Sequence, residues 1–68
     1  MSTTTEVTVA GMTCEHCVAS VTEEVGEIAG VRQVDVVLET GSVTILSDAP
    51  LDSADIESAV TEAGYSLA

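Results

Sequence analysis

Positive charge is almost absent from this sequence. It contains no lysine and one arginine, Arg32, against twelve acidic residues, which gives a formal net charge of −11. Nucleic acids and anionic membranes are bound through Lys and Arg side chains that neutralise phosphate, so the composition excludes both as partners. Two interpretations of the acids remain. They favour a basic protein partner, or they only keep a monomeric surface solvated.

Long apolar segments and bulky aromatic side chains are also missing. No stretch approaches the roughly 20 apolar residues that span a bilayer, and the start, MSTTTEV, has neither the basic nor the apolar region of a secretory signal. We therefore expect a cytoplasmic protein. Tyr65 is the single aromatic residue, whereas there are eleven valines. Residues 1–68 are expected to form one domain with an aliphatic core that favours strands.

The pattern of apolar residues changes from strand to helix early in the chain. Residues 1–5 are polar and are expected to fray, while Val7 and Val9 alternate with polar residues and predict a strand. Apolar residues then recur at helical spacing: Val18, Val21, Val25 and Ile28. Thr13 is the expected N-cap of this helix, and Gly26 and Gly30 mark its end.

A hairpin and a second helix follow. Apolar residues alternate over residues 34–38 and again over 43–45, and Gly41 between them is free to adopt a positive φ. Asp52 is the expected cap of a second helix. Its inner stripe is Ile56, Ala59, Val60 and Ala63. Residues 65–68 are expected to form a short last strand.

The order of these elements is βαββαβ, which predicts an α+β domain. The economical packing of this order is ferredoxin-like, with one four-stranded antiparallel sheet and both helices covering one face of it. The sequence supplies no acid–base pair, nucleophilic triad or phosphate-binding loop, so we do not expect an enzyme.

The two cysteines stand three residues apart in the segment Gly11–Cys17, GMTCEHC, between the first strand and the first helix. In a reducing compartment such cysteines are more often a metal or redox pair than a structural disulfide. A helix N-terminus favours thiolate over thiol. Soft thiolates select soft ions, and Cu(I) does well with two of them, whereas zinc favours about four ligands. The pattern therefore predicts a Cu(I) site at Cys14 and Cys17.

Two other interpretations of this pair stay open. A thiol redox protein would cycle Cys14 and Cys17 between dithiol and disulfide, although such proteins are usually longer and carry Trp and Pro around the cysteines. The cysteines would otherwise be ordinary small apolar residues, which their place in a loop rather than on an apolar stripe disfavours.

Together these segments resemble the heavy-metal-associated domain family. The resemblance rests on GMTCEHC at the first helix, on GVRQVDVVLETGSVTI through the hairpin and on AGY before the last strand, and it covers about residues 5–68. Within the family the sequence is similar to stand-alone bacterial copper chaperones of the CopZ type. An excised metal-binding domain of a metal-transporting ATPase would look alike.

The resemblance implies a function. Cys14 and Cys17 would bind Cu(I) and pass it by ligand exchange to the metal-binding domain of a copper-exporting P-type ATPase, or to a copper-responsive repressor. The two helices would flank the metal loop and dock a partner that presents a basic face. The metal-free protein would be a monomer, and copper would be able to bridge a dimer.

Four residues near the cysteines have expected secondary roles. Met12 is expected to pack beneath the loop rather than to bind metal. Thr13 stands where zinc-transporting relatives tend to carry Asp, which by resemblance favours copper. His16 either points into solvent, or it tunes the pKa of the thiolates or serves as an extra ligand when two molecules share copper. The charge of Glu15 beside it disfavours thiolate. Tyr65 is typical of bacterial carriers and also closes the end of the core.

Overall fold

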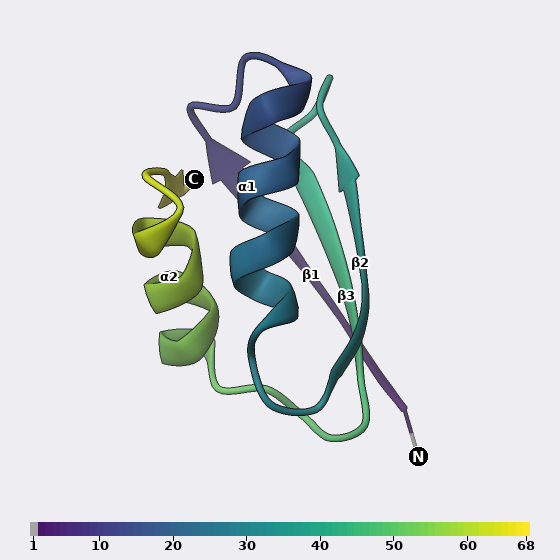
Figure 1. Ribbon diagram of the computed structural model, residues 1–68. Helices are drawn as coiled ribbons and strands as arrows, with labels where there is room; N and C mark the ends of the chain where they lie inside the picture. Colours follow the sequence, from purple (N-terminus) through teal and green to yellow (C-terminus); the bar gives the residue numbers. More distant parts are fainter. Residues whose placement is uncertain (1) are drawn as a thin grey trace.

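The computed structural model describes residues 2–68 and has the six elements in the expected order (Figure 1). The strands are β1 (Thr3–Ala10), β2 (Val31–Val37), β3 (Ser42–Ser47) and β4 (Ser66–Leu67), and the helices are α1 (Glu15–Gly26) and α2 (Ser53–Glu62). The strands form one antiparallel sheet in the order β2-β3-β1-β4. Both helices lie on one face of it (Figure 1). The predicted ferredoxin-like fold is confirmed.

Aliphatic side chains from the sheet and from both helices form the core between these two layers. Val21 and Val25 of α1 are fully buried, because a spacing of four residues places them on one face of the helix. The buried apolar residues are Val9, Val21, Val25, Val43, Ile45, Ile56, Ala59 and Val60. The predicted inner stripe of α2 is confirmed, with Ala63 partly buried against the core. Within the described residues, neither helix is long and apolar enough to cross a membrane.

β1 begins earlier than the sequence predicts. Residues 3–5 were expected to fray but pair with β3, and Thr3 lies opposite Ser47. Polarity alone suggested fraying, yet threonine is a good strand former once a neighbouring strand supplies the hydrogen-bonding partners. The buried hydroxyl of Ser47 donates to the carbonyl of Ala49 at 2.8 Å and so anchors the end of β3. Met1, part of the same expectation, lies outside the described residues.

The turn between β2 and β3 packs against the end of β1. Gly41 has a φ of 75°, as the sequence suggests, and its carbonyl accepts a hydrogen bond from the amide of Val9 at 2.8 Å. A Cβ at this position would lie 2.5 Å from the carbonyl oxygen of Val9. Glycine is therefore required both by the backbone conformation and by the close approach of two strands. Because Val9 precedes Gly11 by two residues, this turn supports the base of the cysteine loop.

Charged residues occupy the ends of two elements. Asp52 is the N-cap of α2, as predicted, and its side chain accepts a hydrogen bond from the amide of Ala54 at 3.0 Å. Arg32 lies near the start of β2, at the edge of the sheet, and forms an exposed ion pair with Asp48. Such exposed pairs contribute little to stability.

Candidate metal centre

The two cysteines meet where β1 gives way to α1. Residues 11–14 connect the two elements, and Gly11 has a φ of 95°. A Cβ on Gly11 would lie 3.4 Å from Cδ1 of Tyr65, so the loop passes directly over the tyrosine ring. Met12 and Tyr65 are partly buried and pack against the core. The loop therefore rests on an apolar support, as expected for Met12.

Cys14 is the N-cap of α1. Its backbone is extended, and its carbonyl accepts hydrogen bonds from the amides of Cys17 at 3.0 Å and Val18 at 3.3 Å. The prediction of Thr13 as the cap is therefore wrong by one residue. Thr13 instead contacts the sulfur of Cys17, with its Oγ1 3.9 Å from Sγ. The side chain of Cys14 makes no capping hydrogen bond and is free to turn toward Cys17.

The two thiols form a close pair at the surface. Their sulfurs are 3.4 Å apart, and both cysteines are free. Cys14 is exposed and Cys17 is partly buried. Across residues 2–68, no three His, Cys, Asp or Glu side chains gather in a cluster that could hold a metal ion. Small rotations of the two cysteine side chains would let both sulfurs contact one soft ion.

Cys17 is held mainly as a thiolate. The amide of Thr13 makes the largest contribution, followed by the hydroxyl of Tyr65 and the thiol of Cys14, and together they lower the pKa of Cys17 from 9.0 to about 6. Hydrogen bonding to Cys17 also raises the pKa of the Tyr65 hydroxyl. At neutral pH one of the two sulfurs is therefore mostly deprotonated before any metal arrives, which is the form that binds metal.

This lowered pKa predicts the alkylation behaviour of Cys17. In Cys14→Ser, which leaves one thiol, the rate of reaction with iodoacetamide should rise with an apparent pKa well below 9.0. Adding Tyr65→Phe should move this pKa upward, because the ring remains and only the hydroxyl is lost. An alkylation rate profile equal to that of the urea-unfolded protein would contradict the lowered pKa of Cys17.

The same pKa shift predicts how stability depends on pH. Since the unfolded chain keeps an ordinary thiol, Cys17 should stabilise the fold increasingly from pH about 6 to about 9 and lose that effect below pH 6.

The other predicted neighbours contact the pair less. Glu15 and His16 lie in the first turn of α1, and both are exposed. The exposure of His16 agrees with its interpretation as a solvent-pointing residue. The structure thus brings Thr13 and Tyr65 to Cys17 and places Met12 beneath the loop.

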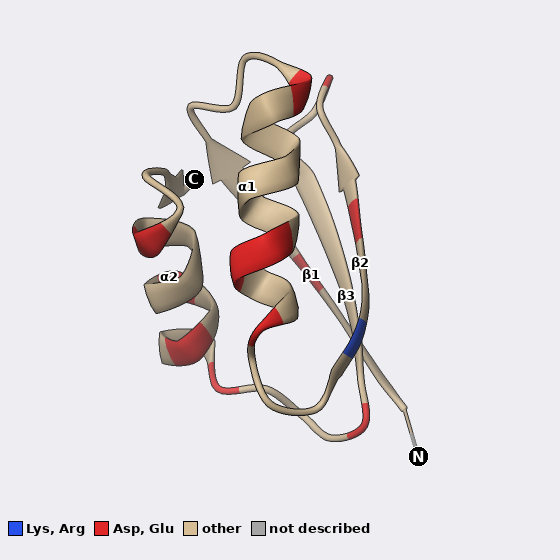
Figure 2. Cartoon of the chain, in the orientation of Figure 1, with Lys and Arg blue, Asp and Glu red and all other residues tan. Residues whose placement is uncertain are grey.

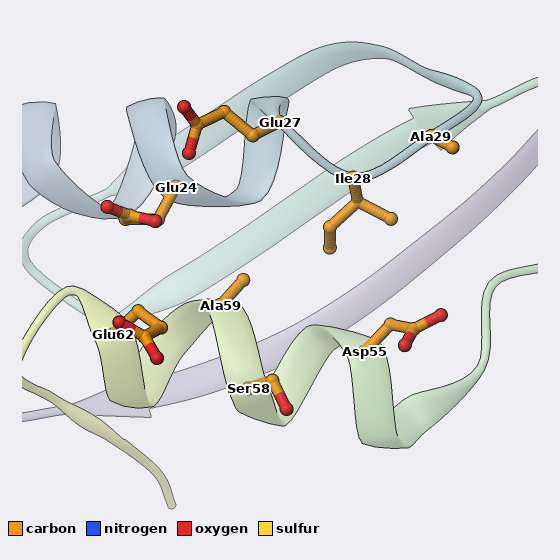
Figure 3. A pocket seen from close by; sticks show the side chains of 8 residues that line it. All are labelled: Glu24, Glu27, Ile28, Ala29, Asp55, Ser58, Ala59 and Glu62. Atoms are coloured by element: carbon orange, nitrogen blue, oxygen red, sulfur yellow. The ribbon is translucent and has the colours of Figure 1, made fainter.

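Acidic side chains are carried by both helices, and four of them border a groove between these helices (Figures 2 and 3). The groove is lined by Glu24, Glu27, Ile28, Ala29, Asp55, Ser58, Ala59 and Glu62. Partial burial, and then the neighbouring charges of Glu27, Glu62 and Glu23, raise the pKa of Glu24. The sequence resemblance predicted a docking surface on the two helices but did not predict this groove. These residues come together only when α1 packs against α2, so the hydrophobic spacing of the sequence could not predict the groove.

The fold and the site together define a small domain that presents two free thiols at a helix N-terminus. A model of the family described as "Heavy-metal-associated domain" matches residues 6–66. The chain is 46% identical over 61 residues to the copper chaperone CopZ of Bacillus subtilis (strain 168), covering 88% of each protein. A solved CopZ metallochaperone superposes with a TM-score of 0.89 at 30% identity, covering 97% of this chain and 100% of that one. The chain belongs to the heavy-metal-associated domain family, and its predicted similarity to CopZ-type proteins is confirmed.

Domains of larger proteins are similar as well. The zinc/cadmium/lead-transporting P-type ATPase of Shigella sonnei (strain Ss046) is 42% identical over 59 residues, which are 87% of this chain and 8% of the ATPase. Copper-transporting ATPase 2 of Homo sapiens is 32% identical over 63 residues, which are 91% of this chain and 4% of the ATPase. Family membership alone therefore leaves the choice of metal to the local chemistry of the loop.

Proposed function

We propose that this chain is a cytoplasmic Cu(I) carrier that holds one ion between the thiolates of Cys14 and Cys17 and is not an enzyme. The observation that carries the proposal is the pair of free thiols 3.4 Å apart at a surface helix N-terminus. Two soft sulfurs suit a monovalent soft ion, whereas zinc favours about four ligands. Similarity to CopZ copper chaperones along nearly the whole chain supports copper as the cargo.

Release of the ion would proceed by ligand exchange. A thiolate of the acceptor forms a bond to two-coordinate Cu(I) and gives a three-coordinate intermediate, after which the bond to one donor cysteine breaks. A second acceptor thiolate then displaces the remaining donor cysteine in the same way. No electron is transferred, and copper stays Cu(I). The exposure of Cys14 supports this route, because an incoming sulfur needs access to the ion.

The acceptor in this proposal is a metal-binding domain of a copper-transporting P-type ATPase. The match between this chain and a segment of such an ATPase supports the pairing, because two similar domains present similar loops to one another. Delivery to a copper-responsive repressor and copper-bridged dimerisation stay predictions of the sequence resemblance.

Metal competition tests the proposed cargo. The anaerobic protein, titrated at neutral pH with Cu(I) and Zn(II) in the presence of a chelator for each, should bind one Cu(I) per chain and release Zn(II). The expected preference follows from the two soft ligands in the loop. Preferential binding of Zn(II) would remove the copper assignment. Zinc retained only at high protein concentration would indicate ligands shared between two chains.

Docking to the acceptor should depend on salt. With eleven net negative charges and acidic helices, the protein is expected to attract a basic face from a distance. Salt shortens the Debye length to ~8 Å near physiological ionic strength, so the rate of copper transfer should fall as salt rises. Charge reversal of Glu23 and Glu24 should slow transfer without changing the affinity for Cu(I). A rate indifferent to salt and to both reversals would show that the acids serve solubility alone.

A dithiol–disulfide couple is the second candidate function, because the short distance between the sulfurs and the low pKa of Cys17 would also favour disulfide exchange. The two candidates separate in an assay of catalysed disulfide reduction with a dithiol reductant. A copper carrier should give the background rate, and multiple turnovers would favour the redox function.

A further inference from the structure

The outer side of β1 is covered along only part of its length. β4 pairs with Val9 and Ala10, and the last hydrogen bond on that side runs from the amide of Ala68 to the carbonyl of Thr8 at 2.8 Å. On its inner side β1 pairs with β3 along Thr3–Thr8. In Figure 1, β4 lies beside the C-terminal end of β1, and the N-terminal half of β1 extends past it. Within residues 2–68, no strand pairs with the outer side of residues 3–7.

Strand alternation identifies the uncovered backbone groups. The carbonyl of Thr8 points outward to Ala68, whereas the amide of Val9 points inward to Gly41. The amide and the carbonyl of one strand residue point to the same side, and this side alternates along the strand. Thr4 and Glu6 therefore present their backbone groups to the uncovered side. The backbone N–H and C=O groups of these two residues form two donor–acceptor pairs about 6.8 Å apart, a spacing that matches the backbone groups of an extended chain.

This edge has few of the features that prevent strand addition. Its register with β3 is continuous, whereas the one irregularity of the larger ladder lies in β2, between Val31 and Gln33. Residues 3–7 contain three threonines and a valine, with neither proline nor lysine. Proline, lysine and bulges are the usual means of blocking an edge strand. Glu6 is the only charged side chain on it.

The charge beside the outer edge of β1 indicates which kind of strand can pair with it. Glu6 is exposed on the face of the sheet away from the helices and lies opposite Thr44 of β3, which in turn lies opposite Asp35 of β2. This row of the sheet thus carries two carboxylates and no basic side chain. A second copy of the chain would add a net charge of −11, its own Glu6 included, which disfavours self-pairing. A lysine or arginine on an added strand, opposite Glu6, would form a favourable cross-strand pair of opposite charges.

We propose that the outer edge of β1, residues 3–7, binds an extended segment of a partner protein by strand addition. The segment carries Lys or Arg opposite Glu6 and β-branched residues two positions to either side of it. Main-chain hydrogen bonds to Thr4 and Glu6 supply the affinity, and the basic residue supplies the specificity. The surface lies at the opposite end of β1 from Gly11, so it is separate from the cysteine loop and independent of the proposed copper function.

The probe is the acetylated and amidated peptide Thr-Val-Thr-Lys-Thr-Val-Thr, titrated into the ¹⁵N-labelled full chain. The amide signals of Thr4 and Glu6 should shift saturably, and those of β2 should not. The same peptide with Glu in place of Lys should bind severalfold more weakly, and a version N-methylated at alternate residues should not bind. Shifts that map to β2, or no shift at residues 4 and 6, would overturn the proposal.

Two variants and one control test the same edge. Thr4→Pro removes a donor that the β3 ladder does not use and should abolish peptide binding. Glu6→Lys should reverse the preference between the Lys and Glu peptides. If Thr4→Pro fails to fold, this reversal alone tests whether the edge of β1 binds the peptide. Asp35→Lys places the same charge change on the same face but on β2, and it should leave the preference intact. Dimers in sedimentation whose shifts map to residues 3–7 would make a second copy the occupant and overturn the proposal.

Discussion

Replacing either Cys14 or Cys17 with serine is expected to abolish tight Cu(I) binding and to leave the fold intact. Losing even an outer partner of a metal ligand typically costs 10–100-fold in affinity, so losing one of two ligands should cost more than about 100-fold. The fold should survive because both thiols lie at the surface loop and neither belongs to the buried core. Competition with a Cu(I) chelator gives the affinity, and urea unfolding of the metal-free protein gives the stability.

His16→Ala is the matched control for this experiment. His16 lies between the two cysteines and is exposed, so its removal disturbs the same turn of α1 without removing a sulfur. We expect its affinity for Cu(I) to stay near that of the original protein. Wild-type affinity in either serine variant would show that the two-thiolate site is wrong. Unfolding of both metal-free serine variants would assign the cysteines a structural role instead.

Gly41→Ala is expected to lower the free energy of unfolding by about 2–4 kcal/mol, because a positive φ and a steric contact act together there. At a φ of 75° the alanine is strained, and its Cβ would meet the carbonyl oxygen of Val9 at 2.5 Å. That oxygen belongs to backbone, so relief requires β1 to move away from the turn. A domain of this length has little stability to spare, and partial unfolding at 37 °C is expected.

Two other glycines separate the causes of this effect. Gly30 also has a positive φ, 89°, but no atom lies within 4 Å of its added Cβ, so Gly30→Ala should show only the strain of about 1–2 kcal/mol. Gly26, at the end of α1, has a negative φ and the same open space, so Gly26→Ala should be neutral or stabilising. Equal losses of stability at Gly41 and Gly30 would show that the contact with Val9 is unimportant.

Hydrophobic spacing was sufficient to predict the elements, their order, the inner stripe of α2 and the buried Val21 and Val25 of α1. Val18 and Ile28, predicted in the same stripe of α1, differ: Val18 is only partly buried, and Ile28 lies beyond the end of the helix at Gly26. Valines and isoleucines recur at periods of two and of about 3.6, and one packing of the strands and helices buries them economically. Asp52 as a helix cap and Gly41 as a turn residue could be predicted from their residue types and immediate neighbours. The cysteine motif likewise indicated where the two thiols meet, because one lies just before the helix and the other in its first turn. These features depend on residues close together in the sequence.

The features that sequence reasoning missed depend on residues far apart. Thr13 has the residue type of a cap, but its hydroxyl oxygen lies 3.9 Å from the sulfur of Cys17, and the N-cap is Cys14. Residues 3–5 have the composition of a frayed end, yet β3 extends far enough to pair with them. The steric reason for Gly41 depends on Val9, and the acidic groove depends on the packing of two helices, so both appear only once the chain has folded.

Arg32, which forms the exposed ion pair with Asp48, has a practical consequence for proteolysis. With no lysine in the chain, Arg32 is the single residue after which trypsin cleaves, and it lies in the edge strand β2, at the register irregularity between Val31 and Gln33. Proteases cleave a segment that has left the ladder, so digestion should proceed only when β2 separates from β3. Cleavage would give two fragments, residues 1–32 and 33–68, with no secondary tryptic products. The rate at which they form therefore reports the fraction of molecules in which this edge of the sheet is open, as long as reclosing is faster than cleavage.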